Sequence, residues 1–249
     1  MPIEQKRSVK GMHRTGKCME RYSVIEEKNK REIVLLRGSG CVYQKCAFCD
    51  YYSDSSKNMR ENDALNRAVL SEVTGKYGDL EVINSGSVFE LGTATLQAIK
   101  EVCAEKAVRT LHFEAHYLYR DRIPELKRFF SGCNVKMKLG LETFDYEFRE
   151  GVLKKGIAER EPAVIAEAFE EANFLFGITG QTVEGMQRDM ELGLRYFERI
   201  CVNLMCRNST AVQPDAAVIR SFTEHLYPLY RENPRVDILL NNTDFGVGD

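Results

Sequence analysis

Three cysteines lie close together in the sequence, at Cys41, Cys46 and Cys49. Thiolates are soft ligands that bind zinc, copper(I) or iron–sulfur clusters. A structural zinc site takes four ligands, usually from two C-x2-C pairs, and this chain contains a single such pair. A 4Fe–4S cluster held by three thiolates keeps one iron open for another ligand. The spacing favours such a cluster, although Cys41 and a histidine could still complete a zinc site.

Short β-rich segments alternate with longer segments whose apolar residues recur every three or four positions. The predicted strands are residues 32–37, 80–84, 109–115, 135–142, 173–178, 199–206 and 236–240. The predicted helices are residues 63–77, 93–107, 122–130, 162–172, 182–197 and 214–230. This alternation predicts a parallel sheet with helices outside it, either a full or partial (β/α) barrel or an open doubly wound sheet. Apolar segments such as 80–84 and 173–178 predict strands that are buried on both faces.

The segments that follow the first six strands are rich in glycine and small polar residues. They are residues 38–50, 84–90, 113–117, 140–145, 177–182 and 203–208. Ligands bind at the carboxyl ends of the strands in both candidate folds. We therefore expect one active site on this rim, with the cysteine segment as part of it. We expect His112 and Cys201, inside strands, to be packed rather than functional.

The composition excludes several classes of protein. The chain has 249 residues, which fits a single α/β barrel domain, and 43% hydrophobic with 29% charged residues is typical of a globular protein. A net charge of −2 disfavours a surface built to bind nucleic acid. We expect neither a membrane span nor a secretory signal. Eight cysteines without such a signal predict reduced thiols in the cytoplasm.

The cysteine segment, with the aromatic Phe48 before its last cysteine, resembles that of the radical S-adenosylmethionine superfamily. The usual spacing there is C-x3-C-x2-C, whereas residues 42–45 make this one C-x4-C-x2-C. The resemblance implies a partial (β/α)6 TIM-like barrel with a short N-terminal leader and a C-terminal extension. It implies a 4Fe–4S cluster on the three cysteines, with S-adenosylmethionine bound to the open iron. Its reductive cleavage gives methionine and a 5′-deoxyadenosyl radical, which abstracts hydrogen from the substrate.

Four further segments are similar to motifs of this superfamily, in the same order. They are NSGS (84–87), FEAH (113–116), GLETFDYEFREGVLKKG (140–156) and FLFGITGQT (174–182), and they look most like the branch with Elp3-like and archaeosine-synthesis enzymes. The arginine expected after Glu114 in that branch is absent. The resemblance implies that Glu142 acts with the cysteines. The implied cofactor-binding residues are Phe48, Asn84, Ser85, Gly86, Ser87, Glu114, Glu142, Thr143, Gly177 and Thr179.

The chain is compact for this superfamily, which indicates a small substrate. We predict an extension (1–31), a barrel core (32–206), and a C-terminal helix, strand and tail (207–249) that close the mouth. The pattern is most similar to the queuine lyases, which release queuine from queuosine or its 5′-phosphate. The expected substrate residues are Glu90, His116, Tyr117, Cys206, Arg207 and Asn208. Glu90 or Asp244 could pair with the aminomethyl cation of that base.

Two other functions stay open at this point. One is radical chemistry on another modified nucleoside or a tRNA base. The other is a zinc-stabilised barrel that binds a metabolite without chemistry. As partners of the enzyme, the resemblance implies a small-molecule substrate and an electron donor such as flavodoxin or ferredoxin, with a homodimer as an open alternative. We expect neither a membrane nor nucleic acid as a partner.

Overall fold

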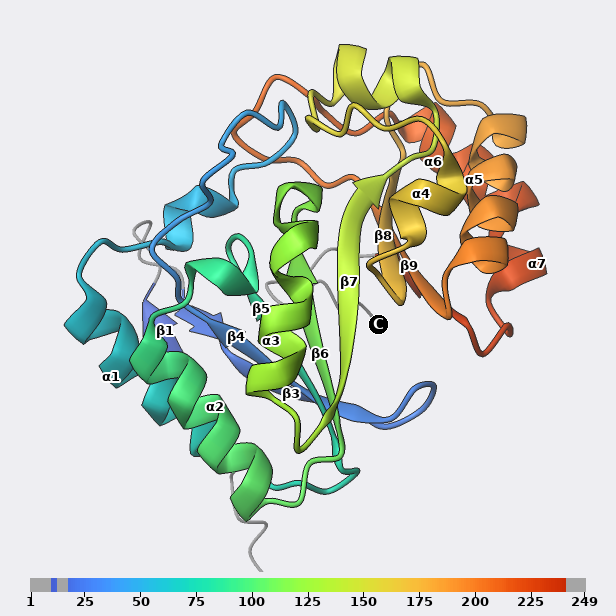
Figure 1. Cartoon of the computed structure of the whole chain (residues 1–249). Coiled ribbons are helices and arrows are strands. Elements are labelled where there is room, and N and C mark those ends of the chain that lie inside the picture. The colour runs from blue at the N-terminus through green and yellow to red at the C-terminus, as the bar shows by residue number, and fades with distance from the viewer. Residues whose placement is uncertain (1–9, 13–17, 241–249) are drawn as a thin grey trace, which may run out of the picture.

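The computed structural model describes residues 10–12 and 18–240, and its central feature is a curled, open sheet (Figure 1). The strand order is β10-β9-β8-β7-β6-β5-β4-β3, parallel except for the β3–β4 pair. These strands are β3 (Tyr22–Ile25), β4 (Arg31–Leu36), β5 (Asp79–Asn84), β6 (Thr110–Ala115), β7 (Asn134–Glu142), β8 (Glu171–Phe176), β9 (Arg199–Leu204) and β10 (Val236–Leu239). A separate two-stranded sheet joins β1 (Lys10–Met12) to β2 (Cys18–Glu20). The predicted partial TIM-like barrel is confirmed.

Helices connect the parallel strands and cover the outer face of the sheet (Figure 1). They are α1 (Met59–Leu70), α2 (Thr93–Glu105), α3 (Ile123–Phe129), α4 (Pro162–Ala166), α5 (Val183–Tyr196), α6 (Ala216–His225) and α7 (Tyr227–Tyr230). Short helical turns are η1 (Tyr51–Asp54), η2 (Val88–Glu90), η3 (Tyr117–Arg122) and the π-helical η4 (Phe148–Val152). No helix in residues 10–12 and 18–240 is long and apolar enough to cross a membrane.

The central strands bury apolar side chains beneath the helices and carry several charged side chains on the inner face. In β6, Leu111 and Phe113 belong to the main hydrophobic core beneath the helices, whereas His112 and Glu114 alternate with them. In β5, Glu81 is buried on the inner face and forms an ion pair with Lys138 of β7. The predicted burial of residues 80–84 on both faces is confirmed, with Ile83 alone half-buried, but the inner face buries charged side chains such as Glu81 beside apolar ones.

The buried charges are paired across neighbouring strands. Arg31 and Lys138 both contact the Glu81 carboxylate, and Arg199 lies 2.8 Å from Glu171. Burial alone raises the pKa of Glu81, but these cations outweigh burial and hold the pKa well below its usual range. Taking a charge out of water costs several kcal/mol, roughly, unless a partner compensates it. The pairs therefore make a charged inner face compatible with a stable fold.

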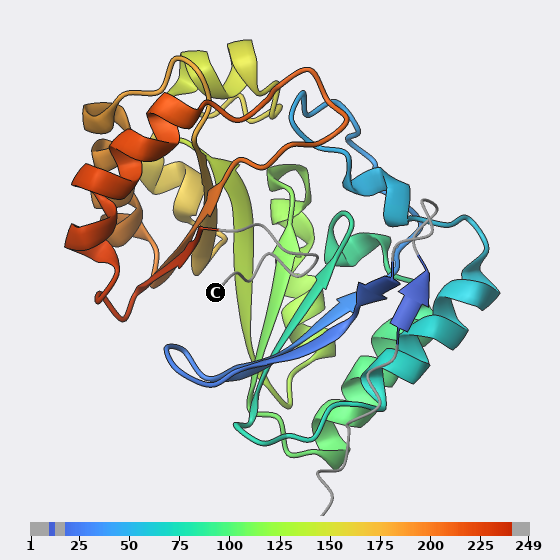
Figure 2. The same ribbon diagram turned by 180° about the vertical axis from the view of Figure 1, so that it is seen from behind.

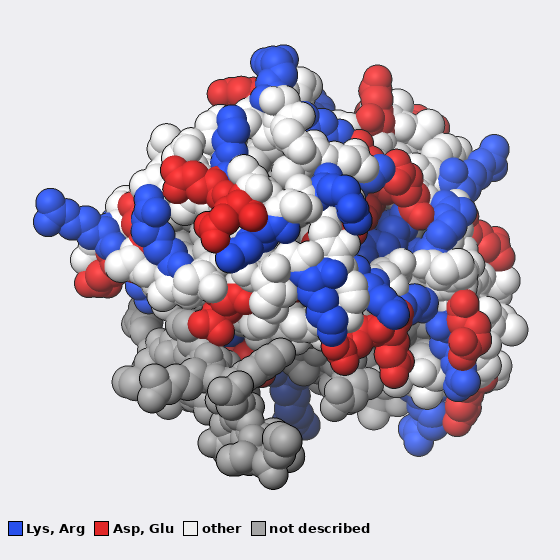
Figure 3. Space-filling view, turned by 90° about the horizontal axis from the view of Figure 1, so that it is seen from below, with Lys and Arg blue, Asp and Glu red and all other residues white. Residues whose placement is uncertain are grey.

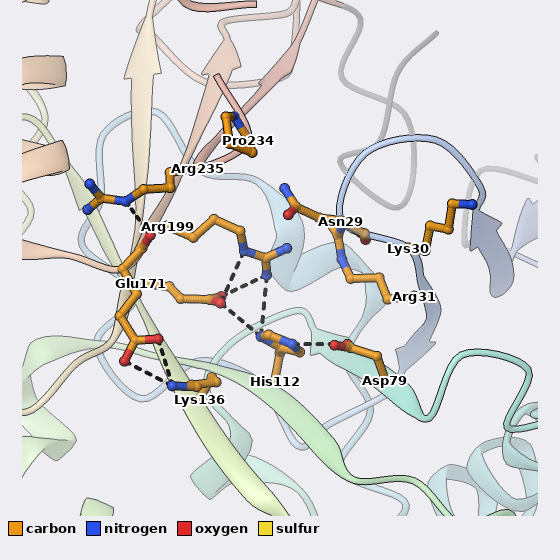
Figure 4. A pocket seen from close by; sticks show the side chains of 11 residues that line it. Asn29, Lys30, Arg31, Asp79, His112, Lys136, Glu171, Arg199, Pro234 and Arg235 are labelled. Atoms are coloured by element: carbon orange, nitrogen blue, oxygen red, sulfur yellow. Dashed lines mark hydrogen bonds and ion pairs between the residues drawn. The ribbon is translucent and has the colours of Figure 1, made fainter. Parts of the chain in front are cut away.

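A cavity of about 340 Å³ lies at the amino-terminal ends of these strands, away from the cysteine loop (Figure 4). His112 projects between Asp79 and Glu171, with Nε2 3.0 Å from Asp79 Oδ1 and Nδ1 2.9 Å from Glu171 Oε1. The Nε2–Asp79 contact is a close ion pair rather than an aligned hydrogen bond, and Nδ1 also lies 3.3 Å from a guanidinium nitrogen of Arg199. Viewed from below, Lys and Arg are interspersed with Asp and Glu (Figure 3). The charged groups around this cavity are thus engaged with one another and belong to the framework of the fold.

The turn between β3 and β4 holds the two edges of the open sheet together (Figure 2). Lys28 Nζ donates to the carbonyls of Arg231 and Asn233, at 2.9 and 3.1 Å, and to that of Val236. Asn29 Nδ2 donates to Asp237 Oδ1 at 2.8 Å. The turn at the β3 edge of the sheet is therefore joined to β10 at the opposite edge by side-chain hydrogen bonds.

Several segments differ from the sequence prediction, among them the predicted helix 63–77, which begins at Met59 and ends at Leu70. Residues 22–25 of the predicted leader form the edge strand β3. The predicted helix 162–172 ends at Ala166, because Glu171 enters β8 to pair with Arg199. The predicted helix 214–230 is divided into α6 and α7, with Pro228 in the first turn of α7. The domain boundaries at 31 and 206 stay predictions, and the tail 241–249 with Asp244 lies outside the described residues.

Replacing Lys28 should weaken the link between the sheet edges. We expect Lys28→Met to lower the free energy of unfolding by about 1–3 kcal/mol, because three carbonyl oxygens lose a charged donor. Lys30→Met is the matched control, since Lys30 is exposed on the same turn and should change stability by less than about 0.5 kcal/mol. Urea denaturation measures both, and equal losses in the two variants would contradict the proposed link.

Stability should fall as pH rises through the titration of His112. Burial lowers the pKa of His112, but Asp79 and Glu171 outweigh burial and raise it above the ordinary value. The stabilising charge is fully present below about pH 6.5, the unfolded value, and is lost as pH rises through the raised folded value, by at most about 1.4 kcal/mol per pH unit. Urea midpoints measured upward from about pH 6 should decline less steeply in His112→Gln. Parallel curves would rule out this role.

Candidate active site

The cysteine loop, residues 37–50, leaves β4 at its carboxyl end and carries Cys41, Cys46 and Cys49, all half-buried. Burial raises the pKa of the Cys46 thiol to about 12, although the Lys155 ammonium opposes this rise. Burial also raises the pKa of Cys49, and the neighbouring Cys41 adds to the rise of both Cys46 and Cys49. Thiols of this kind keep their protons at neutral pH until a metal displaces them.

The residues of the loop fit a 4Fe–4S cluster. Three thiols on one loop are the donor set of a cluster with one open iron. Within the described residues, no three His, Cys, Asp or Glu side chains converge on one point where a metal ion could sit. A cluster does not require such convergence, because each thiolate binds a different iron. Lys155 offsets part of the negative charge that three thiolates bring together.

Neighbouring loops hold the backbone of the cysteine loop in place. Ala47 N donates to the carbonyl of Leu153 at 2.9 Å. Asn208 Nδ2 donates to the carbonyl of Phe48 at 2.6 Å, and Ser209 donates to the Asp50 carboxylate through both its amide and its hydroxyl. The loops after β7 and β9 thus reach over to the loop after β4 at the top of Figure 1.

The longer spacer between the first two cysteines has its own supports. Gln44 has a φ of 51°, a left-handed backbone conformation that is uncommon for a residue with a side chain. The Tyr43 ring stacks on His116, with ring centroids 4.6 Å apart, and its hydroxyl donates to the Lys154 carbonyl at 2.8 Å. A Cβ on Gly156 would lie 2.4 Å from the Tyr43 ring, so only glycine lets this ring lie flat on the backbone.

The segment 84–87 lies directly beside the cysteine loop. A Cβ on Gly86 would lie 3.4 Å from Cys41 Cα and 2.1 Å from Glu90 Oε2, so the close approach requires glycine. Asn84 Nδ2 donates to the Ser87 carbonyl at 3.1 Å, which shapes the turn. The Ser85 hydroxyl lies 3.4 Å from the buried carboxylate of Asp54. The structure therefore brings the predicted cofactor segment to the predicted cluster.

Glu90 connects this segment to the cysteine loop. Its carboxylate accepts from the backbone N–H of Val42 at 2.7 Å, from that of Ser87 at 2.6 Å, and from the Tyr119 hydroxyl at 3.1 Å. The side chain is buried. Substrate contact by Glu90 stays a prediction, but these three bonds occupy the carboxylate and give it a positioning role.

His116 is held as a neutral ring by its surroundings. Its Nδ1 accepts from Leu118 N at 3.1 Å, so Nε2 carries the proton and donates to the Lys155 carbonyl at 2.7 Å. Its own backbone N–H donates to the Ser87 hydroxyl at 2.9 Å. Burial, and then the Lys155 cation, lower the pKa of His116 to about 4. Both ring nitrogens are engaged, so the expected substrate contact can come only from a ring face.

Glu142 and Lys155 form a buried ion pair next to the cysteines. Glu142 ends β7 at a bulge with a φ of 72°, a strained conformation that occurs mostly at functional sites. Its Oε1 accepts from Lys155 Nζ at 2.7 Å. Burial lowers the pKa of Lys155, but Glu142 and Cys46 outweigh it and raise the pKa above its ordinary value. Sequence reasoning missed Lys155 as a site residue, although it lies in the motif segment 140–156.

Two other predicted cofactor residues, Phe48 and Glu114, lie in different surroundings. Phe48 packs on an apolar cluster of Leu153, Leu175, Ile178 and Met205 and lies 5.5 Å from Lys155 Nζ. Glu114 is on the inner face, with Asn173 Nδ2 2.8 Å and Lys138 Nζ 3.7 Å away.

The predicted cofactor residues in the segments after β7 and β8 are Thr143, Gly177 and Thr179. Gly177 has a φ of 91° and is buried. Thr143 is buried and accepts from Asp145 N, and the exposed Thr179 donates to Asp215 at 2.8 Å. The threonine hydroxyls are thus engaged within the fold, and their contact with cofactor stays a prediction.

The predicted substrate residues do not all meet at the site. Tyr117 belongs to the main hydrophobic core and stacks on Phe169, with centroids 6.4 Å apart, so its placement does not favour substrate contact. Cys206 Sγ lies 3.7 Å from the Leu204 carbonyl, and Arg207 is exposed. Asn208 holds the cysteine loop, as described above.

Gly156 and Gly151 provide a matched test of the Tyr43 contact. We expect Gly156→Ala to destabilise the protein by about 1–3 kcal/mol, because its φ of 75° and the Tyr43 ring both exclude a Cβ. Gly151→Ala should stay within about 0.5 kcal/mol, since a Cβ there meets no atom within 4 Å. Urea denaturation and iron content after anaerobic reconstitution measure the effects. Full stability and full iron content in Gly156→Ala would contradict this assignment.

Comparisons with known proteins agree with this geometry. No protein-family model matches the chain. The solved queuine lyase from Clostridium spiroforme, bound to S-adenosylmethionine and queuine, is 43% identical, with a TM-score of 0.88 over 93% of this chain and 100% of that one.

Of two more distant matches, one supports the fold and neither indicates a function. Methylornithine synthase (PylB), at 13% identity and a TM-score of 0.57 over 83% of this chain and 63% of that one, shares the fold. An uncharacterised protein of Methanocaldococcus jannaschii is 28% identical over 163 residues, which are 58% of this chain and 44% of that protein, so the match spans less than half of that relative. The identity and coverage of the first match are sufficient to assign the family: the chain belongs to the queuine lyases of the radical S-adenosylmethionine superfamily.

Proposed function

We propose that this protein is a queuine lyase, which uses S-adenosylmethionine and a 4Fe–4S cluster to release queuine from queuosine or its 5′-phosphate. The observation that carries the proposal is the 43% identity, over the whole length of the other chain, to a queuine lyase bound to S-adenosylmethionine and queuine. The side-by-side placement of the three cysteines, residues 84–87 and the Glu142–Lys155 pair supports it.

Different residues of the chain would bind the cluster and S-adenosylmethionine. Cys41, Cys46 and Cys49 would hold the cluster, which together with S-adenosylmethionine supplies the 5′-deoxyadenosyl radical. We propose that residues 84–87 and Glu142 bind S-adenosylmethionine beside it. The surrounding hydrogen bonds keep these groups at fixed positions, which is the protein's main contribution to such chemistry.

The inner face of the sheet is the proposed substrate surface. Glu114 pairs in register with Lys138, four residues before Glu142 on β7, so it lies deeper in the curled sheet than the Glu142–Lys155 pair. Its side chain is 28% exposed, whereas that of Glu81 on the same face is 5% exposed. We propose that Glu114, rather than the occupied Glu90, meets the aminomethyl cation of the base. Cys206, Arg207 and Asn208 remain proposed substrate contacts.

Two further properties are part of the proposal. The reaction consumes an electron, so the enzyme needs a donor of the flavodoxin or ferredoxin class. Thiols that must stay reduced to hold a cluster support a location in the cytoplasm.

Anaerobic turnover tests the proposed function. Reconstituted protein with S-adenosylmethionine, reductant and queuosine or its 5′-phosphate should yield 5′-deoxyadenosine and free queuine, quantified by mass spectrometry. Cys46→Ser should lower both products by about a hundredfold or more, because a cluster ligand is lost. Cys133→Ser is the matched control, as a half-buried cysteine outside the site that should retain activity.

Other outcomes of this assay would overturn the proposal. A colourless protein that holds zinc and forms no 5′-deoxyadenosine would show a metabolite-binding barrel instead. Formation of 5′-deoxyadenosine without release of queuine would place the substrate among other modified nucleosides or tRNA bases.

A further inference from the structure

An exposed apolar patch lies on the cysteine loop and the residues around it. Of the eight large hydrophobic side chains that are exposed in the described part of the chain, four lie in the short segment 42–59. Val42 is 68% exposed, Tyr51 51% and Tyr52 59%. Val152, 39% exposed, adjoins them, because the next residue, Leu153, accepts a hydrogen bond from Ala47 of the loop. Contiguous exposed apolar groups commonly mark interaction sites.

Cations surround this patch. Lys45, Lys57 and Lys154 are exposed, and the structure records no ion pair for any of them in the described residues. The Lys154 carbonyl accepts from Tyr43 of the loop, and Lys57 Nζ lies beside Gly40, next to Cys41. We refer to Val42, Lys45, Tyr51, Tyr52, Lys57, Val152 and Lys154 as the cysteine-loop patch.

The acidic residues within the same segments are engaged by hydrogen bonds or an ion pair with other parts of the protein. Asp50 accepts from Ser209, and Asp54 is buried against Arg21. Glu150 accepts from the backbone N–H groups of Gly156 and Ile157. The chain as a whole carries a net charge of −2, yet within residues 42–59 and 150–154 the exposed lysines have no ion pair in the described residues, whereas the carboxylates are engaged with the protein itself. Such a local asymmetry attracts an acidic partner and steers its approach.

The position of the patch indicates what kind of partner it receives. Electron transfer weakens steeply with distance, so a protein donor must dock on the surface nearest to the cluster thiols. The patch consists of two residues of the loop that carries those thiols, Val42 and Lys45, and of residues that adjoin this loop. A second copy of this chain would bring the same lysines face to face in a symmetric dimer, which disfavours self-association through this patch.

We propose that the cysteine-loop patch is the docking surface of a small acidic one-electron carrier protein, an inference that rests on the proposed function because that reaction consumes the electron. The carrier loses one electron and the cluster gains it, with no bond formed or broken at the interface. Electron-transfer complexes of this kind use small, weak and salt-sensitive interfaces, which a few apolar side chains ringed by lysines can provide.

Charge reversal tests the proposal with two readouts. In the holoenzyme, Lys45→Glu/Lys57→Glu/Lys154→Glu should slow cluster reduction by reduced flavodoxin roughly tenfold or more, followed by the loss of cluster absorbance, because electrostatic steering changes association rates by ~10- to 10³-fold. Calorimetric titration with oxidised flavodoxin, which needs no turnover, should show weaker binding and a smaller effect of salt. Val42→Ser/Tyr52→Ser should weaken binding without changing its salt dependence.

Two controls separate docking from other effects. Lys100→Glu/Arg188→Glu/Arg220→Glu makes the same change of charge on exposed positions of the outer helices and should leave reduction by flavodoxin unchanged. Reduction by photoreduced 5-deazariboflavin, a small uncharged donor, should be the same in all variants with equal iron content.

The outcomes distinguish this proposal from the proposed function. Reduction of the patch variant by flavodoxin at the wild-type rate, or an equal loss in the helix control, would overturn the docking surface. A wild-type protein that is reduced by both donors but releases no queuine would overturn the proposed function and leave the docking surface standing.

Discussion

The buried carboxylate of Glu90 is the contact on which the site depends. One oxygen accepts from Val42, the residue after Cys41, and the other accepts from Ser87 in the adjacent segment 84–87. Two loops that follow different strands are thereby held to one side chain. A carboxylate that accepts several hydrogen bonds from N–H groups is strongly held, and removing it would leave buried donors without partners. The geometry between the cysteine loop and residues 84–87 follows from this single group.

A second constraint comes from the curvature of the sheet. An open sheet that curls around a polar interior has no opposite layer to cover its inner face, so each charge on that face needs a partner on a neighbouring strand. Glu81, Lys138 and Arg199 meet this requirement in the lower part of the sheet. Nearer the site, Glu114 is less enclosed. The same face therefore serves as rigid framework at one end and as the proposed substrate surface at the other.

Much of this arrangement could be predicted from the sequence. The strand–helix alternation, the position of the cysteine loop and the order of the motifs depend on local pattern, and all seven predicted parallel strands are present within a few residues. The short antiparallel strand β3 was missed because residues 22–25 are recognisable as a strand only through their pairing with β4. The roles of Glu90, His116 and Lys155 could not be predicted either, because their partners lie far away in the sequence and converge only in the folded chain.

The stack of Tyr43 on His116 has a consequence for how such loops can change over time. The longer spacer places Tyr43 where it needs a flat neutral ring on one side and a residue without a side chain, Gly156, on the other. These three residues come from separate loops. Removing one spacer residue would displace the Tyr43 ring, and His116 and Gly156 would then lack the ring that they contact. Loop length, histidine and glycine are therefore a unit that must be inherited or exchanged together. A chimeric enzyme made by transplanting the loop alone would carry a mismatch in two segments that the transplant never touched.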